Sequence, residues 1–215
     1  MSGGAARSRA LSIAGASGVG AAALALVVPL LGGMARPGYD ACAQYISELG
    51  ESGAADAAWV NLGGFLPIGV LSVGFACIAA RFADGWRARV GLSLASGVGF
   101  AYLLAAFFPC DPGCPSPGSA TQQIHSSGAL AEYLGGGAGI LLASGARVRG
   151  AALAPRWLAF TASAIALAAF AGMLAPALQP ARGLVQRSAE LALFAWLFVA
   201  ARNLQRAVRR QASPG

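Results

Sequence analysis

Long apolar stretches alternate with short polar segments along most of the chain. Six stretches are each about 20 residues long, the length that a helix needs to cross about 30 Å of hydrocarbon. They cover residues 11–34, 59–80, 90–108, 125–144, 157–177 and 184–201. The pattern predicts an all-α bundle of six transmembrane helices. It forms one membrane domain over residues 11–204, between an N-terminal segment (1–10) and a tail (205–215).

Composition supports a membrane protein and argues against a soluble domain. Hydrophobic residues make up 57% of the chain and charged residues only 11%, whereas soluble domains carry about 25% charged residues. The chain also has 30 glycines, and small residues let helices in lipid approach closely. Gly135 and Gly139 have the small-xxx-small spacing of such contacts.

The net charge of +7 comes from arginine alone and follows the topology. The connections on one side of the six spans, together with both ends of the chain, hold twelve of the fifteen arginines. The other side holds Arg36, Arg182 and Arg187. Because positively charged loops stay in the cytoplasm, both termini are expected there. Nucleic-acid binding is therefore not expected.

The first apolar stretch has a second interpretation, as a secretory signal peptide cleaved near Met34. Signal-peptide cores are typically about 7 to 15 residues long, and this stretch is longer, so we expect a retained span. Cleavage would leave the rest of the topology unchanged.

Polar residues inside or beside apolar spans are the candidate functional residues, because burying an unpaired polar group is costly. Eight qualify: Glu48, Asn61, Asp111, His125, Glu132, Gln186, Arg187 and Glu190. Most lie at the outer ends of their helices. We expect Glu48, Asp111 and His125 in one outer pocket with Glu132 at its floor, since residues seven apart share a helix face. Alternatively, Glu190 only neutralises Arg187, and His125 only begins its helix.

Several kinds of chemistry are disfavoured by residue counts. The chain has one histidine, so a histidine-rich zinc site and haem bound by two histidines are not expected. No G-x-S-x-G nucleophile motif is present. A metal ion held by Glu48, Asp111, His125 and Glu132 stays open as an alternative, but no metal site is predicted, and the sequence identifies no cofactor.

The four cysteines divide by position. Cys77 lies within the second span and is expected to pack there as a small residue. The other three are expected on the outer, oxidising side. The turn sequence between Cys110 and Cys114 favours a disulfide between them. Pairing of Cys42 with either one, and a cysteine metal site, stay open.

Four segments together resemble a known family: residues 45–50 (YISELG), Asn61 with Gly64, residues 108–115 (FPCDPGCP), and Ile124 with His125. In this order they resemble the bacterial membrane family called domain of unknown function 998. The layout is more distantly similar to the Frag, DRAM and Sfk group, whose members are linked to lipid remodelling, lipid asymmetry and autophagy. The resemblance implies a multi-pass protein of the bacterial inner (plasma) membrane and a function connected with lipids.

The expected function is therefore binding or processing of a lipid or another amphiphile in an outward-facing polar pocket, with membrane lipids as partners. One alternative is a membrane hydrolase acting on an ester or phosphoester, with His125 as general base. Others are a proton-coupled transporter that uses Glu132 and Glu190, or a structural subunit of a homo-oligomer or larger membrane complex.

Overall fold

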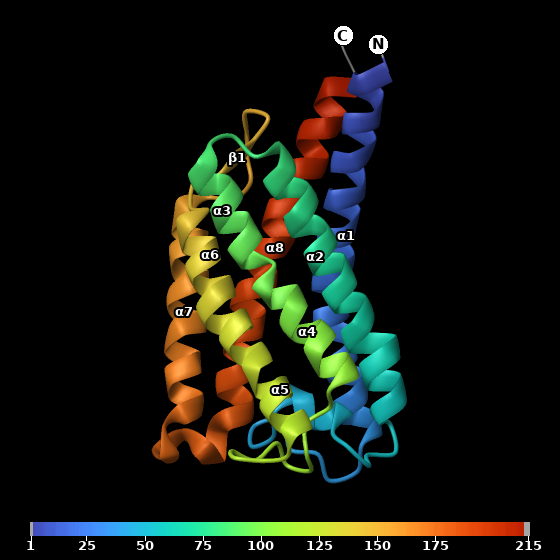
Figure 1. Cartoon of the computed structure of the whole chain (residues 1–215), viewed down its shortest axis with the longest axis vertical. Coiled ribbons are helices and arrows are strands. Elements are labelled where there is room, and N and C mark those ends of the chain that lie inside the picture. Colours follow the sequence, from blue (N-terminus) through green and yellow to red (C-terminus); the bar gives the residue numbers. More distant parts are fainter. Residues whose placement is uncertain (1, 213–215) are drawn as a thin grey trace.

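Residues 2–212 are described by a computed structural model, and they fold into a bundle of long helices with a small hairpin (Figure 1). Residues 2–212 form six helical rods, and three of these contain more than one helical segment. The rods are α1 (Ser2–Ala35), η2 and α2 (Trp59–Phe65, Leu66–Phe82), α3 and α4 (Trp86–Ala95, Gly97–Phe107), α5, η3 and α6 (Ala120–Ala129, Leu130–Gly136, Gly137–Leu142), α7 (Arg156–Leu174) and α8 (Arg182–Ala212). The connections hold two 3₁₀ helices, η1 (Ile46–Gly50) and η4 (Pro176–Ala181), and the strands β1 (Arg147–Val148) and β2 (Ala151–Ala152).

The prediction of an all-α membrane bundle is confirmed, with differences in detail. Among the described residues, five rods are long and apolar enough to cross a membrane. The rod formed by α5, η3 and α6 is not one of them, since it carries His125 and Glu132. Helix α8 continues to Ala212, so most of the segment predicted as a tail is helical.

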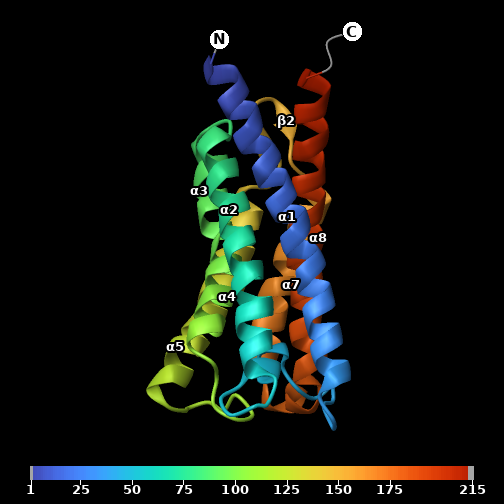
Figure 2. The ribbon, with the colours of Figure 1, turned by 90° about the vertical axis from the view of Figure 1, so that its right-hand side faces the viewer.

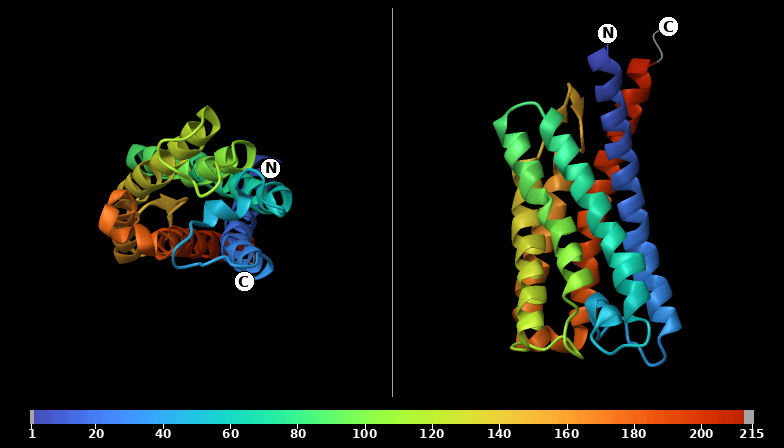
Figure 3. Two further views of the ribbon diagram at one scale, coloured as in Figure 1. Left: turned by 90° about the horizontal axis from the view of Figure 1, so that it is seen from below. Right: turned by 45° about the vertical axis from the view of Figure 1, so that its right-hand side comes forward.

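Both termini lie at the same end of the bundle (Figure 1). Helix α1 packs along α8 and α2 (Figure 2). The end with the termini also holds the turn before α3 and the β1–β2 hairpin, and we call it the arginine-rich end. The opposite end, the loop end, holds the connections 36–58, 108–119 and 175–181 (Figure 3). Each rod therefore joins one end to the other.

Glycines let two pairs of helices touch backbone to backbone. A Cβ atom on Gly69 of α2 or on Gly99 of α4 would lie 2.8 Å from the carbonyl oxygen of the other residue. Gly91 of α3 and Gly139 of α6 meet in the same way, at 2.8 and 2.7 Å. The expected small-residue contact thus holds for Gly139, whereas Gly135 has only distant neighbours. Small residues set the spacing of α2, α3, α4 and α6.

The outer surface of the bundle is suited to lipid. Large apolar side chains such as Leu30 and Phe160 are exposed on it. Trp86 and Trp157 are exposed near the arginine-rich end, and Trp59 is exposed at the loop end. Tryptophans gather where a bilayer meets water. The chain is a multi-pass membrane protein.

Candidate functional site

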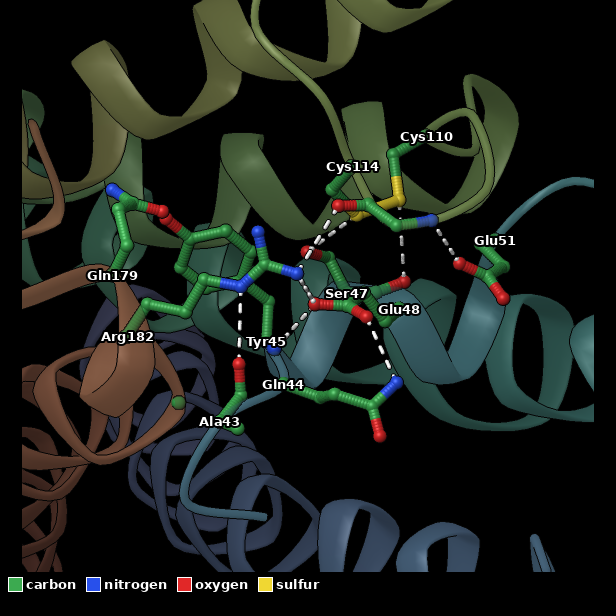
Figure 4. Close-up of polar contacts among 12 residues, drawn as sticks. Ala43, Gln44, Tyr45, Ser47, Glu48, Glu51, Cys110, Cys114, Gln179 and Arg182 are labelled. Atoms are coloured by element: carbon green, nitrogen blue, oxygen red, sulfur yellow. Dashed lines mark hydrogen bonds and ion pairs between the residues drawn. A yellow bond between two sulfur atoms is a disulfide. The ribbon is translucent and has the colours of Figure 1, made fainter. Parts of the chain in front are cut away.

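The connection between α1 and η2 folds around the buried carboxylate of Glu48. Its side chain is 2% exposed. It accepts hydrogen bonds from the Arg182 guanidinium at 2.8 Å, the Tyr45 backbone N–H at 2.8 Å and the Gln44 side-chain amide at 3.0 Å (Figure 4). Arg182 also stacks over the Tyr45 ring, 4.6 Å from its centroid, and donates to the carbonyl of Ala43. Glu48 is therefore fully engaged in holding this connection to α8.

A second ion pair ties the same connection to the loop between α4 and α5. Arg36 pairs with Glu51 and donates to the backbone carbonyl of Glu48. Glu51 also accepts a hydrogen bond of 2.6 Å from the backbone of Gly113. The Ser52 N–H donates to the carbonyl of Cys110 at 2.8 Å. The two loops form one folded layer at the loop end.

The predicted disulfide joins Cys110 to Cys114 within this layer. The Ser47 hydroxyl lies 3.4 Å from the Cys114 sulfur (Figure 4). Cys42 is unpaired and exposed, so the alternative pairing is wrong. Cys77 is also exposed, on the surface of α2, which corrects its expected role as a packing residue.

Asn61, in the π-helical segment η2, forms a hydrogen bond to the loop layer. Its side-chain amide donates to the carbonyl of Gly50 at 2.8 Å. Its Oδ1 is buried and has no hydrogen-bond partner among the described residues. Because this oxygen packs against Gly50, a residue with a Cβ atom does not fit at position 50.

Asp111 and His125 each have hydrogen-bond partners other than Glu48. Asp111 accepts hydrogen bonds from the backbone and hydroxyl of Ser119, both at 2.7 Å. These bonds lower the pKa of Asp111 below its ordinary value. His125 Nδ1 lies 3.0 Å from the carbonyl of Phe108. Within residues 2–212, no direct hydrogen bond joins His125 to Glu48, Asp111 or Glu132, so the expected shared pocket stays a prediction.

The alternative metal site is not assembled. Within the described part of the chain, the potential ligands that come within 4.8 Å of one another are Cys110, Cys114 and His125. The two sulfurs are bonded to each other, so they offer no thiolates.

Glu132 instead meets Glu190 inside the bundle. Glu132 is 7% exposed and lies in the π-helical segment η3, and Glu190 is 5% exposed and lies on α8. The two carboxyl groups are neighbours in the bundle interior, and Glu132 Oε1 has no hydrogen-bond partner among the described residues. Tyr133 donates to Glu190 Oε1 at 2.8 Å, and Tyr102 of α4 donates to Oε2 at 2.9 Å. Sequence reasoning missed both tyrosines, although each lies within or beside an apolar stretch.

Arg187 lies one helical turn before Glu190 but is not ion-paired with it. The guanidinium donates to the carbonyls of Gln44 and Gly183, at 2.9 and 3.1 Å, and to the Tyr39 hydroxyl at 2.5 Å. Among the described residues, no carboxylate oxygen lies within 4 Å of the Arg187 guanidinium nitrogens, the distance that defines an ion pair. The prediction that Glu190 only neutralises Arg187 is therefore not supported. Burial raises the pKa of Tyr39, and the nearby Arg187 opposes this shift.

The neighbouring residue, Gln186, completes the contacts of α8 with the loop layer. Its side-chain oxygen accepts a hydrogen bond of 2.6 Å from the Ile46 backbone. Gln186 therefore fixes the start of η1 and faces the layer.

A groove of about 360 Å³ lies between α1 and α8 near the loop end. Its lining is mostly apolar, with three polar side chains. It consists of Ala25, Leu26, Pro29, Leu30, Gly33, Met34, Tyr39, Ala41, Ile46, Arg187, Glu190, Leu191 and Phe194. Pro29 has no N–H to donate to the Ala25 carbonyl, which weakens α1 along this wall. Leu30 and Met34 are 62% and 77% exposed, so the groove opens sideways through the bundle surface.

Of the eight predicted residues, Arg187 and Glu190 thus line the groove, and Glu132 supports it through Glu190. The Tyr39 contribution was missed, because its pairing with Arg187 joins positions far apart in the sequence.

A family model described as "Protein of unknown function (DUF998)" matches residues 19–203. No curated protein and no solved structure matches the chain.

Proposed function

The chain belongs to the DUF998 family, and from that premise we propose that this multi-pass membrane protein binds a single-chain amphiphile with an anionic headgroup in the groove between α1 and α8. The observation that carries the proposal is the placement of Arg187. Its charge lies at the wall of an apolar groove with no carboxylate in ion-pair contact among the described residues. A partly buried charge is stabilised when an opposite charge approaches it.

The groove offers separate places for the two parts of such a ligand. Arg187 presents N–H groups at the end that adjoins the loop layer, beside Tyr39, whose own O–H donates to the carbonyl of Tyr45 at 2.8 Å. Leu26, Leu30 and Leu191 provide an apolar wall along the helices. Because the wall opens sideways, an alkyl chain can enter from the bilayer while its headgroup reaches Arg187. An arginine guanidinium can bind carboxylate, sulfonate or phosphate oxygens with two parallel hydrogen bonds.

The arginine distribution supports an orientation for this site. With the arginine-rich end in the cytoplasm, the groove faces the outer leaflet. We place the protein in the bacterial inner membrane on the same grounds and on its family resemblance. The ligand would then be an amphiphile of the outer leaflet.

Binding can be tested with a dansyl-labelled dodecylsulfonate and protein in phosphatidylcholine nanodiscs. The readout is the rise in dansyl fluorescence as the probe leaves water. We expect saturable binding, and we expect Arg187→Gln to weaken it by at least about tenfold through loss of a charge-assisted contact. A dansyl-labelled probe with a trimethylammonium headgroup on the same chain, measured separately, should show no saturable binding.

Two leucines on α1 provide a matched steric control. Leu30 lines the groove, whereas Leu31 is exposed outside it. Leu30→Trp should block the alkyl chain, and Leu31→Trp should leave binding unchanged. Equal binding to the wild type, Arg187→Gln and Leu30→Trp proteins, all with unchanged thermal unfolding, would overturn the proposal.

A further inference from the structure

The pair formed by Glu132 and Glu190 lies directly behind the groove. Two neighbouring carboxyl groups in an apolar interior cannot both be ionised, because the repulsion and the loss of hydration are too costly. Glu190 accepts from Tyr102 and Tyr133 through its two oxygens, which suits the ionised form. Glu132 has an oxygen without a partner among the described residues. When the pair holds one proton, these hydrogen bonds thus favour its location on Glu132.

From this geometry we infer that occupation of the groove by an anion is linked to uptake of a second proton by the Glu132–Glu190 pair. The inference rests on the proposed function and concerns its regulation. Glu190 lines the groove beside Arg187, so its negative charge opposes an incoming anion. Protonation of Glu190 removes that charge and leaves Arg187 as the dominant charge.

The groups that face the pair are few. Tyr102 comes from α4, Tyr133 from η3, and Arg187 from α8. Residues 11–35 of α1 and 157–174 of α7 include no titratable side chain, and Cys77 of α2 is on the outer surface. The arginine keeps its charge at every relevant pH. Tyr39 also lines the groove and contacts Arg187, but burial raises its pKa above the ordinary value of about 10. The carboxyl pair is therefore the element near the groove that titrates below that range.

Linkage is reciprocal, so a ligand that favours a protonated state binds more tightly at lower pH. Uptake of one proton changes affinity by up to about tenfold per pH unit. The sulfonate probe keeps its charge throughout, so any pH dependence comes from the protein. We expect the dissociation constant of the wild-type protein to fall as pH is lowered from about 8 to about 5, where a buried carboxyl pair takes up its second proton.

Glu190→Gln mimics the protonated form and should remove this dependence. The variant should bind the probe at all pH values about as tightly as the wild type does at the lowest pH. Calorimetry in two buffers of different ionisation enthalpy should detect proton uptake in the wild type even if the variant folds poorly. His125→Gln, which alters a remote titratable group, should keep the wild-type slope.

The outcomes separate the two proposals. Probe binding that depends on Arg187 but does not vary with pH, with no proton uptake, would overturn the inference and leave the binding function intact. Binding that ignores Arg187 and Leu30 would overturn the proposed function itself. Loss of the slope in His125→Gln but not in Glu190→Gln would also overturn the inference, because it would assign the proton to another site.

Discussion

The two ends of the bundle use arginine in opposite ways. All twelve arginines of the arginine-rich end are exposed, and none is ion-paired among the described residues. At the loop end, Arg36, Arg182 and Arg187 are each partly buried and hydrogen-bonded to the folded loop layer. Charge at the first end is dispersed over a water-facing surface. Charge at the second end is used in specific contacts.

A bias in arginine number between the two ends does not give the role of each arginine. The rule for topology counts positive charges near span ends and treats the three at the loop end as exceptions. Two of them form the two ion pairs found in residues 2–212, Arg36 with Glu51 and Arg182 with Glu48. Arg187 alone of the three lies at the groove without such a partner. That difference separates a structural arginine from a binding candidate.

The largest expected difference between the ends is their accessibility from the two sides of the membrane. In a Cys77→Ser background, a membrane-impermeant maleimide should label Cys42 at the loop end in intact cells. Arg149→Cys, in a background with Cys42→Ser as well, should react only after permeabilisation. The disulfide-bonded cysteines should not react. The reverse labelling pattern would contradict cytoplasmic termini.

Next in size is the cost of removing the central carboxylate of the loop layer. Glu48→Gln should lower the free energy of unfolding by about 3 kcal/mol or more, because it leaves the Arg182 charge without its buried partner. Denaturant unfolding of the purified protein in detergent measures this loss.

Asp84 provides the matched control at the other end. Its exposed carboxylate accepts one hydrogen bond of 2.7 Å from Gly150. Asp84→Asn should cost less than about 1 kcal/mol. Equal losses of unfolding free energy in the Glu48 and Asp84 variants would show that a carboxylate at the loop end contributes no more to stability than one at the arginine-rich end.

The disulfide should contribute less than Glu48. It links residues separated by 4 positions, and closing so short a loop restricts the unfolded chain by about 2 kcal/mol. Replacing Cys110 and Cys114 by serine should lower stability by that amount, and a reducing agent should have the same effect on the wild type. Cys42→Ser, the control, should change nothing. A wild type indifferent to reduction would contradict the prediction.

The sequence was sufficient for the parts of the fold that depend on local properties. Apolar length predicted the helices, and the turn between Cys110 and Cys114 predicted their disulfide. The bounds failed at α1 and α8, because polar residues extend a helix beyond the apolar stretch. The π-helical segments η2 and η3 were not predicted, since no residue pattern marks the extra residue that each accommodates.

The candidate site was predictable only as a list of residues. Each of the eight has polar contacts or a buried polar atom, as the cost of burying polar groups requires. Their grouping depends on which helices are neighbours and how each is rotated. Glu132 lies beside Glu190 rather than His125, because the side chains of both glutamates point from their helices, η3 and α8, into the bundle interior. That relation is between distant segments, and residue spacing within one helix cannot give it.

The smallest expected effect concerns Asp111, on the surface of the loop layer. Hydrogen bonds from Ser119 lower its pKa in the folded protein. A carboxyl with a lowered folded pKa adds stability above its unfolded pKa and loses that contribution as pH falls through the folded value. The wild-type protein should therefore lose a little stability below about pH 4, where aspartate protonates. Asp111→Asn cannot titrate, so its Tm should fall less steeply than that of the wild type over that acid range. The difference in Tm between the two proteins should be smaller than the loss caused by removing the disulfide. Parallel curves for the two proteins would contradict the prediction, because the Ser119 contacts would then favour neither protonation state.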